Sequence, residues 1–579
     1  MTTTFDHLQD RAPFAAGRGH IAPAEAAASS ETATRRERWP WALAALSLVV
    51  YITAAWWLIY RRGYEINDAI SRTSMADHVV LSRDPHLGAM GWYWMPLPQI
   101  SQIPMVFATY LFHQVRFAGP LTSALWAAAV IPVLASIARS LGVPKKFAVI
   151  GCGLYAFSPI AVFSAANGMS EASSFFFLAV TMLGYTRWDR LRKESALVLM
   201  SIGLAGMMLC RYETLGLAPA LALLCALQAP RIQRKRAFVI VILPTAYVFT
   251  LWLWASSIIT NDAFYWYKQT RLIGAGSVGQ IPAILGQHYS GVAPVVRFVL
   301  IMMLLFAGVV LAMAPLCLVR DRHRLLSFLG YLGPPLTFGF LVLAQLLAHT
   351  TSAGVRYFYP SWLLGVILAF AVIGDRHRLP RQGAVRGVRW YGIAAIGMCI
   401  PLQLSGFLNL RIASAEFESV LFAPLLGKTP PSPPNGAWDS TVVPWQQLFH
   451  YVDPQLAAGA SLMLDTESSS QAVLFTRHPR QLIIPEDRDF EQILAAPYGH
   501  VDFIAIPEGS FARISRYIVA MRAVAASPGP QGGYARVASY GPLTLYKYST
   551  GPPSVPAPGA TTIERQQPSN TTTVASTAP

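Results

Sequence analysis

The sequence predicts a polytopic α-helical membrane protein with about eleven transmembrane helices and a small C-terminal α/β domain. Three observations predict this class. The 579-residue chain is 54% hydrophobic and only 13% charged, whereas a soluble protein of this size carries about 25% charged residues. Its apolar runs reach the length of about 20 residues that a helix needs to cross a bilayer. Short basic clusters separate these runs, and short apolar segments typical of buried strands follow the last of them.

The first 40 residues are rich in Ala, Thr, Glu and Arg, and we expect them to form a disordered tail. The tail ends in Arg35, Arg36 and Arg38, directly before Trp41–Tyr60, which contains no charged residue. A cleavable signal peptide has a shorter apolar core that lies nearer the start of the chain. This segment therefore predicts an uncleaved signal anchor.

The apolar runs predict a transmembrane domain over residues 41–410. The expected spans are 41–60, 118–138, 147–165, 170–187, 196–210, 213–229, 237–258, 296–319, 325–348, 358–374 and 390–409. Basic clusters fall on alternate connections, on the side of Arg35–Arg38, which places the N-terminus in the cytoplasm. Arg61 and Arg62, at the other end of the first span, are the exception. We expect a multi-pass protein of the cell (plasma) membrane.

The net charge of +16 is a poor indicator of a nucleic-acid partner, because much of the excess lies in the short hinges that set topology. The five cysteines all lie in expected spans, so we expect small packing residues and no disulfide framework. They are Cys152, Cys210, Cys225, Cys317 and Cys399. We therefore expect membrane lipid, rather than nucleic acid, around this chain.

An odd number of spans places the remainder of the chain outside the cytoplasm. A linker over 411–440, which includes a Pro-rich stretch, leads to an extracytoplasmic α/β domain over 441–548. Short buried strands are expected at 461–465, 481–485 and 501–506, helices at 487–496 and 509–523, and a terminal hairpin at 537–548. Residues 549–579 are rich in Pro, Ser and Thr and are expected to be disordered.

A polar loop over residues 61–99, between the first two spans, is the strongest functional signal. A pore or scaffold has no need of such a loop, whereas an enzyme that works at the membrane surface does. Residues 65–80 of the loop predict a short helix along the membrane, on which Asp68, Arg72 and either Met75 or Ala76 share a face. Asp68 is then a candidate catalytic base; the alternative is a surface ion pair with Arg72, worth about 0–1 kcal/mol.

Further polar clusters are expected on the same face of the membrane. They are Asn167–Glu171, Arg211–Glu213, Arg356–Pro360 and the aromatic segment 259–295. Ionisable groups at membrane depth are costly and are functional candidates by default. Each cluster also has an ordinary interpretation, in which Arg211 pairs with Glu213, Glu171 caps a helix that starts after Ser170, and Arg356 ends a helix. Their convergence on one face favours a site.

The order of these parts resembles the GT-C superfamily of membrane glycosyltransferases, in particular the protein O-mannosyltransferase, aminoarabinose-transferase and Rgt-like branches. The residues that carry the resemblance are Asn67-Asp68 soon after the first span, the run Gly91–Pro98, Gly168–Glu171, Arg211–Glu213 and Arg356-Tyr357. The mannosyltransferase branch has an Asp-Glu pair in its first loop, so only Asp68 matches the acidic role here. The resemblance implies an inverting, polyprenyl-phosphate-sugar-dependent enzyme whose acceptor is a glycan, lipid or protein.

The chemistry of such a transfer assigns roles to these residues. An acceptor hydroxyl is a poor nucleophile, and Asp68 is the candidate general base that takes its proton. The leaving lipid phosphate needs positive partners, for which Arg211 and Arg356 are the first candidates and Arg72 the next. Four further candidates are substrate-binding residues: Glu171, Glu213, His86 and Tyr357.

Several assignments stay open at this point. His78 and His86 contact phosphate or sugar, or are exposed loop histidines. Trp92, Tyr93 and Trp94 either stack on sugar or lie among lipid headgroups, and the headgroup position is favoured for Trp266. No cofactor is expected. A divalent metal at Asp68, Asp84 and His86 is conceivable from their ligand chemistry, but nothing in their spacing demands one.

Two functions from other classes compete with a transferase. A transporter or flippase for a lipid-linked sugar would also need charge in the membrane, but with interrupted helices at mid-depth and repeat symmetry. No repeat is visible in this sequence. A structural anchor for the C-terminal domain would leave Asp68 and Arg356 freely replaceable.

Overall fold

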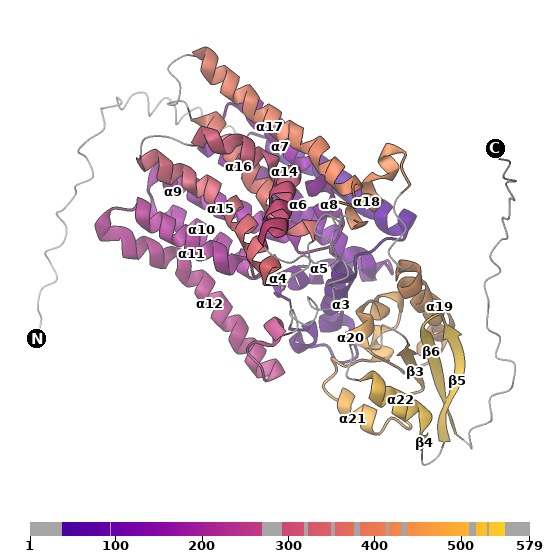
Figure 1. The fold of residues 1–579 in the computed structure, drawn as a ribbon. Helices are drawn as coiled ribbons and strands as arrows, with labels where there is room; N and C mark the ends of the chain where they lie inside the picture. Colours follow the sequence, from indigo (N-terminus) through magenta and orange to yellow (C-terminus); the bar gives the residue numbers. More distant parts are fainter. Residues whose placement is uncertain are drawn as a thin grey trace, which may run out of the picture.

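The computed structural model describes residues 37–92, 94–268, 292–317, 322–348, 354–375, 382–412, 416–429, 437–508, 517–529 and 532–550. Nearly all of the two expected disordered tails, Tyr93 and parts of the expected linker and of segment 259–295 lie outside these residues. Two bodies are seen in Figure 1, a large helical bundle and a smaller C-terminal domain that contains a sheet.

Each expected span contains a helix. The bundle helices are α2 (Trp39–Trp56) with the π-helical turn η2 (Trp57–Arg61), α6 (Ala118–Ser140), α7 (Lys145–Ala156), α8 (Pro159–Ala166), α9 (Glu171–Leu191), α10 (Glu194–Met208), α11 (Thr214–Gln228), α12 (Arg234–Thr260), α14 (Val292–Cys317), α15 (Arg322–Leu347), α16 (Tyr359–Gly374) and α17 (Gln382–Leu408). Among the described residues, seven helices are long and apolar enough to cross a membrane, or eight if the bent pair α7–α8 is one span. Helices α10 and α11 are apolar but shorter.

The bend between α7 and α8 has a local cause. The two helices meet at 53°, because Pro159 lacks an amide hydrogen and cannot continue α7. Ser158 starts α8 instead, and its side-chain oxygen accepts a hydrogen bond from the Ala161 amide. The same hydroxyl accepts a hydrogen bond from Trp362 Nε1 at 2.9 Å, which ties the bend to α16.

Helix α16 lies at the centre of the bundle. All of its residues are buried, as expected for a helix that is apolar on every side. Helices α14, α15, α17, α6, α7 and α9 contact it. A short 3-10 turn, η6 (Val355–Phe358), precedes α16, so Arg356 lies at one end of the central helix.

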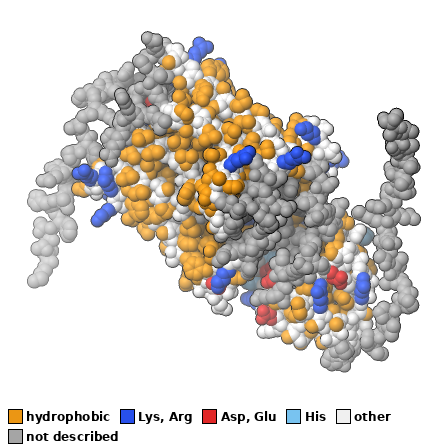
Figure 2. Space-filling model, in the orientation of Figure 1, with side chains coloured by type: hydrophobic (Ala, Val, Ile, Leu, Met, Phe, Trp, Pro, Cys, Tyr) orange, Lys and Arg blue, Asp and Glu red, His pale blue; other side chains and the backbone are white. Residues whose placement is uncertain are grey.

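The outer surface of the bundle is apolar. In the view of Figure 2, hydrophobic side chains cover much of the bundle and are interrupted by few Lys and Arg residues. Helix α12 contributes several of these side chains, namely Leu243, Tyr247, Leu251, Trp254 and Ile258, all of which are exposed. Such a surface is stable against lipid and not against water. The five cysteines are all buried.

The polar loop folds into short helices at one end of the bundle. These are α3 (Asn67–Leu81), η3 (Leu87–Met90), α4 (Leu97–Ile100), α5 (Ile103–Tyr110) and η4 (Val115–Phe117). The helix expected at 65–80 is therefore confirmed as α3. It is not an open surface helix, however, because most of its residues are buried. In Figure 1, α3 lies between the bundle and the C-terminal domain.

The C-terminal domain is built on a mixed sheet whose order is β2-β1-β3-β6-β5-β4. Its strands are β1 (Leu462–Leu464), β2 (Leu482–Ile483), β3 (Phe503–Pro507), β4 (Pro528–Gly529), β5 (Gly532–Tyr540) and β6 (Leu543–Thr550). Strands β2, β1 and β3 are parallel, and Leu462 pairs with Leu482 on one side and with Phe503 on the other. Strand β6 is antiparallel to both β3 and β5. The three expected strands and the hairpin are confirmed.

Helices cover the sheet and connect it to the bundle. They are α18 (Glu416–Phe422), η7 (Pro424–Leu426), α19 (Ala437–Ala457), α20 (Thr466–Ser469), η9 (Ser470–Phe475), η10 (Pro479–Gln481), α21 (Phe490–Ala495) and α22 (Ile518–Ala526). Helix α21 lies within the helix expected at 487–496. The helix expected at 509–523 begins in residues outside the described part, and α22 covers its second half. Helix α19 was not expected from the sequence.

Close packing of α9 on α10 generates a prediction about stability. A Cβ atom on Gly184 would lie 2.4 Å from the backbone nitrogen of Met200, which cannot move without shifting α10. We expect Gly184→Ala to destabilise the protein by about 1–3 kcal/mol, as overpacking does. Gly153→Ala is the matched control, because an added Cβ there meets nothing within 4 Å.

Thermal unfolding of the detergent-purified variants measures this difference. The control is expected to keep or slightly raise the melting temperature, since Ala is the better helix former. Equal melting temperatures for the two variants would contradict the described contact between α9 and α10.

Candidate active site

Polar residues that are far apart in the sequence meet at the α3 end of the bundle. They come from the first turns of α3, the start of α9, the turn between α10 and α11, and η6. Seven of the eight predicted site residues form this cluster, through ion pairs, ring contacts or electrostatic interactions: Asp68, Arg72, Glu171, Arg211, Glu213, Arg356 and Tyr357. The remaining residue, His86, has its contacts with Asp84.

Asp68 and Arg356 form the accessible part of the cluster. Arg356 Nη1 donates a hydrogen bond to Asp68 Oδ2 at 2.8 Å, and the side chains are 36% and 35% exposed, respectively. The local ion pair of Asp68 with Arg72, which was the alternative from sequence, is not the pair that forms. A partner 288 residues away replaces it. The pair is therefore open to a ligand and fixed by the tertiary fold.

The charge state of Asp68 follows from its neighbours. Burial raises the pKa of Asp68, but the guanidinium groups of Arg356, Arg72 and Arg211 outweigh burial and lower the pKa below its ordinary value. Asp68 also lies in the first turn of α3, where the helix dipole favours a negative charge. The side chain is consequently ionised at neutral pH.

Arg211 is held by two carboxylates. Its Nη1 lies 2.9 Å from Glu171 Oε1 and its Nη2 lies 2.6 Å from Glu213 Oε1, and all three side chains are at most 15% exposed. The ordinary interpretation, in which Arg211 pairs with Glu213, is therefore right and is extended by Glu171. Ser170 makes no side-chain capping bond, but Glu171 lies in the first turn of α9, so it is both a helix-start acid and a partner of Arg211.

Arg72 is the cation of the site that lacks a carboxylate partner within ion-pair distance among the described residues. Its guanidinium lies 4.2 Å from the centre of the Trp94 ring, and Nη1 lies 3.4 Å from Gln99 Oε1. The residue is 6% exposed, and its Nε has no hydrogen-bond partner within the described part of the chain. Burial lowers the pKa of Arg72 to about 10, against the opposing effects of Asp68 and Glu171. Arg72 is therefore still a cation at neutral pH.

Tyr357 connects the two other arginines. Its ring centre lies 5.9 Å from the guanidinium carbon of Arg211 and 5.5 Å from that of Arg356. Cations at such distances from an aromatic ring are stabilised by its electron-rich face. The ring thereby helps to hold two like charges near each other.

Sequence reasoning missed a buried acid beside this cluster. Glu418, on α18, is 4% exposed and accepts a hydrogen bond from the Tyr359 hydroxyl. Its Oε2 has no hydrogen-bond partner within the described part of the chain. Arg356 and Glu171 both affect its ionisation. An acid in the first residues after the last span was the available signal, but it lay in the segment that was expected to be a linker.

The aromatic and histidine candidates have mostly packing roles. Trp92 stacks on Trp252 with ring centres 4.6 Å apart, and Trp266 stacks on Tyr212 at 4.2 Å, so neither ring is an isolated headgroup anchor. Of the tryptophans in the loop, Trp94 is the one that contacts a site arginine. His78 is buried rather than an exposed loop histidine. No cluster of His, Cys, Asp and Glu in the described part of the chain is placed to hold a metal ion.

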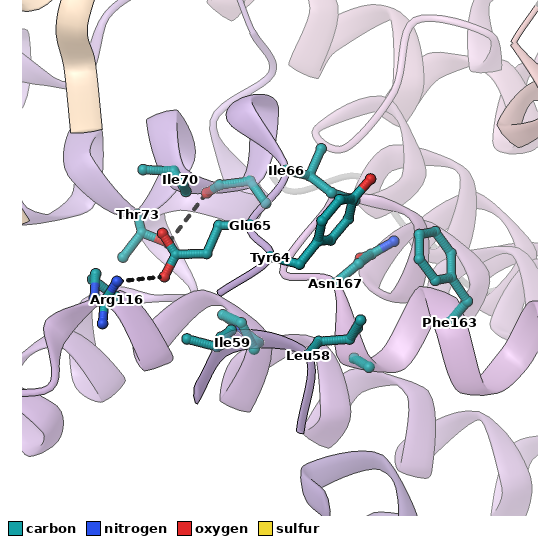
Figure 3. A pocket seen from close by; sticks show the side chains of 13 residues that line it. Leu58, Ile59, Tyr64, Glu65, Ile66, Ile70, Thr73, Arg116, Phe163 and Asn167 are labelled. Carbon is teal, nitrogen blue, oxygen red and sulfur yellow. Dashed lines mark hydrogen bonds and ion pairs between the residues drawn. The ribbon is translucent and has the colours of Figure 1, made fainter. Parts of the chain in front are cut away.

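A small pocket lies behind the cluster, on the other face of α3. It is lined by Ala69, Ile70 and Thr73 of α3 and by residues of η2, α6 and α8. In Figure 3 the Glu65 carboxylate points toward Arg116, and the two groups are 3.1 Å apart. The pocket has room for about one water molecule, so it is too small for a sugar.

Comparison with known proteins identifies the fold. No protein-family model matches the sequence, and no curated protein matches it. Among solved structures, ArnT from Cupriavidus metallidurans bound to undecaprenyl phosphate is similar with a TM-score of 0.50 and 12% identity, over 88% of this chain and 97% of that one. This likeness shows that the chain shares the fold of that protein, as the resemblance seen in the sequence led us to expect.

Two other solved structures show weaker similarity. The arabinofuranosyltransferase AftD from Mycobacteria matches with a TM-score of 0.38 and 14% identity, over 88% of this chain and 41% of that one. The Archaeoglobus fulgidus oligosaccharyltransferase matches with a TM-score of 0.31 and 14% identity, over 87% of this chain and 73% of that one.

The buried acid generates a prediction about pH. Burial raises the pKa of Glu418 from its ordinary value of 4.5 to about 7. A carboxyl whose folded pKa is raised contributes stability that is fully present below the unfolded pKa and is lost as pH rises through the folded pKa. We therefore expect the wild type to lose stability relative to Glu418→Gln between about pH 4.5 and pH 7.

Thermal unfolding of both proteins across this pH range measures the difference. Because other groups titrate in both proteins, the difference between the two curves is the quantity of interest. A difference that does not change with pH would show that Glu418 has the same pKa in the folded and unfolded chains.

Proposed function

We propose that this chain is a membrane glycosyltransferase that moves a sugar from a polyprenyl-phosphate donor to an acceptor hydroxyl, with inversion at the anomeric carbon. The observation that carries the proposal is the accessible pair of Asp68 and Arg356 beside the buried, uncompensated Arg72. The transfer requires a carboxylate that takes the proton of the acceptor and positive charge that stabilises the leaving phosphate. The site brings the two together. The GT-C fold supports the reaction class.

Asp68 is the general base of the proposed reaction. The carboxylate is ionised and accessible, and its helix holds it beside the arginines. It takes the proton of the acceptor hydroxyl as that oxygen attacks the anomeric carbon, and the bond from this carbon to the phosphate oxygen breaks on the opposite side. Proton transfer of this kind contributes about 10²–10⁴-fold to the rate.

Arg72 and Arg356 hold the leaving lipid phosphate. The sequence favoured Arg211 and Arg356, with Arg72 behind them. The contacts support a different order, because the charge of Arg211 is already balanced by Glu171 and Glu213. Arg72 has no carboxylate within ion-pair distance among the described residues, and Arg356 can exchange the Asp68 carboxylate for a phosphate. The undecaprenyl phosphate in the ArnT structure supports a polyprenyl-phosphate carrier for this chain as well.

Binding of the phosphate also prepares the base. In the free protein, Arg356 helps to keep the pKa of Asp68 low, and a carboxylate with a low pKa is a weak base. When a phosphate draws Arg356 away, this cause weakens and the pKa of Asp68 rises toward the operating pH. The donor therefore activates the base that takes the proton of the acceptor hydroxyl.

The other predicted residues have supporting roles. Glu171 and Glu213 hold Arg211, and their direct contact with substrate stays a prediction. Tyr357 lies between Arg211 and Arg356. His86, which contacts Asp84, stays a prediction as a substrate-binding residue. The transporter alternative is less well supported, because the described charge cluster lies at one end of the bundle rather than at mid-depth.

Replacement of the proposed base gives the first functional prediction. Asp68→Asn keeps the shape of the side chain and cannot accept the proton, so we expect transfer to fall by about 10²–10⁴-fold. The assay measures transfer of labelled sugar from a panel of polyprenyl-phosphate sugars to acceptors in a membrane extract. Glu194→Gln is the control, since Glu194 forms an exposed pair with Arg236 outside these clusters. Full activity of Asp68→Asn would rule out the base.

The second functional prediction concerns the phosphate. Arg72→Gln removes a charge-assisted hydrogen bond worth about 1.5–3 kcal/mol, so we expect the affinity for undecaprenyl phosphate to fall by about 10–100-fold. Arg72→Lys is expected to lose less, because it keeps the charge without the planar fork. Binding of the labelled lipid to the purified protein measures both. An unchanged affinity in Arg72→Gln would assign Arg72 to packing.

The orientation is proposed from the basic residues: N-terminus in the cytoplasm and C-terminal domain outside, in the plasma membrane. Val519, on α22, is 73% exposed, and the five native cysteines are buried. We expect a cysteine placed at residue 519 to react with a membrane-impermeant maleimide on intact cells. Labelling that requires lysed cells would reverse the orientation.

A further inference from the structure

The C-terminal domain contacts α3 with the edge of its sheet where the parallel strands end. Thr466 follows β1 there, and Glu486 and Asp487 follow β2. In α/β proteins this edge is the usual place for a ligand. Here α3 occupies it: His78 of α3 is buried, and its Nδ1 lies 3.9 Å from Glu486 Oε1. Glu486 also accepts a hydrogen bond from Thr466.

A second contact lies nearer the proposed catalytic residues. Ser470, the first residue of η9, has its hydroxyl oxygen 2.6 Å from that of Ser71. The Ser74 hydroxyl donates a hydrogen bond to the carbonyl oxygen of Ser470. Ser71 lies three residues after Asp68 and directly before Arg72. The first residue of η9 therefore contacts the helical turn that carries Asp68 and Arg72.

Ion pairs form the third contact, just beyond the end of α3. Arg83 lies 2.9 Å from Asp487 through Nη2 and 3.1 Å from Asp489 through Nη1. Its neighbour Asp84 accepts hydrogen bonds from the backbone nitrogen and the Nε of Arg488 at 3.0 and 2.9 Å. The positive charge of Arg83 thus lies between two acids of the domain, and the negative charge of Asp84 faces the arginine that separates these acids.

The composition of α3 explains why it needs these contacts. Its sequence, NDAISRTSMADHVVL, is polar for a helix of which most residues are buried. Apolar packing alone cannot hold such a helix, because its buried polar groups must find partners. The domain supplies hydrogen-bond partners to Ser71 and Ser74, and its Glu486 lies 3.9 Å from His78.

We propose that the C-terminal domain is the positioning element of the active site. The three contacts described above, which we call the clamp, hold α3 so that Asp68 and Arg72 lie beside Arg356. Ser470, Asp487 and Arg488 are the positioning residues that the domain contributes to this clamp. The inference rests on the proposed function and assigns the domain a part in the reaction itself. It requires that loosening the clamp should disturb α3 and slow the transfer together.

Charge reversal with rescue tests the clamp. Arg488→Asp faces Asp84 with a like charge, whereas the double variant Asp84→Arg/Arg488→Asp restores the attraction with the charges exchanged. The control is Arg236→Glu, which reverses a charge in the exposed pair of Arg236 with Glu194 and lies outside the clamp. Each protein is compared with the wild type by hydrogen exchange of residues 67–81, by melting temperature, and by kcat and donor KM for transfer.

We expect the single reversal to speed exchange in 67–81 by about tenfold and to lower kcat by a similar factor, as a change of about 1.4 kcal/mol does. The melting temperature should change little, since both partners lie near the surface. The double variant should recover both properties, and the control should change neither. Ser74→Ala, which removes the bond to Ser470, is a second and milder variant expected to act in the same direction.

The outcomes separate the two proposals. Faster exchange with an unchanged kcat would overturn the positioning role and leave the proposed function standing. Unchanged exchange in both Arg488→Asp and Ser74→Ala would show that the domain does not clamp α3. Absence of transfer by the wild type would overturn the proposed function, and the positioning role with it, even where exchange responds as expected.

Discussion

The ion pair of Asp68 with Arg356 is the interaction on which the site depends. It joins the first turn of α3 to η6, the turn that leads into α16, which the bundle buries on all sides. Because packing fixes α16, the position of Arg356 is fixed as well. The ion pair can form only if α3 is held where Asp68 reaches Arg356. The other contacts of α3 hold Asp68 beside Arg356, and the two side chains of the pair stay partly exposed.

Charge balance then divides the arginines by role. A buried ion that loses its partner costs several kcal/mol, and Arg211 avoids this cost by binding both Glu171 and Glu213. Arg72 does not avoid it within the described chain: its guanidinium has an aromatic ring and an amide oxygen near it instead of a carboxylate. On the proposed function, this unbalanced charge is the part of the site that binds an anionic ligand. A lipid phosphate, which arrives from the membrane with its own negative charge, would complete the balance.

The sequence was sufficient for most of the elements and for the residues that come together at the α3 end of the bundle, whose roles in the reaction stay predictions. Apolar runs locate the bundle helices because every lipid-facing or core-facing residue contributes to the signal, and the strands at 461–465 and 501–506 are recognisable from short apolar runs between polar segments. The partnerships were not predictable. Asp68 had a plausible partner four residues away in Arg72, and only the tertiary fold selects Arg356 in its place. Glu418 was missed because a single acid in an expected linker carries no periodic pattern, and the contact of Ser470 with α3 depends on how two domains meet.

The central claim is that the Asp68 carboxylate acts as the base in sugar transfer, and chemical rescue tests it most directly. Asp68→Gly leaves a space where the carboxylate stood, beside the same arginines. The account predicts that this variant transfers almost no sugar and that added formate restores a measurable part of the rate, while formate has no such effect on Arg72→Gln. Transfer by Asp68→Gly at the wild-type rate without formate would contradict the account, because the reaction would then proceed without this carboxylate.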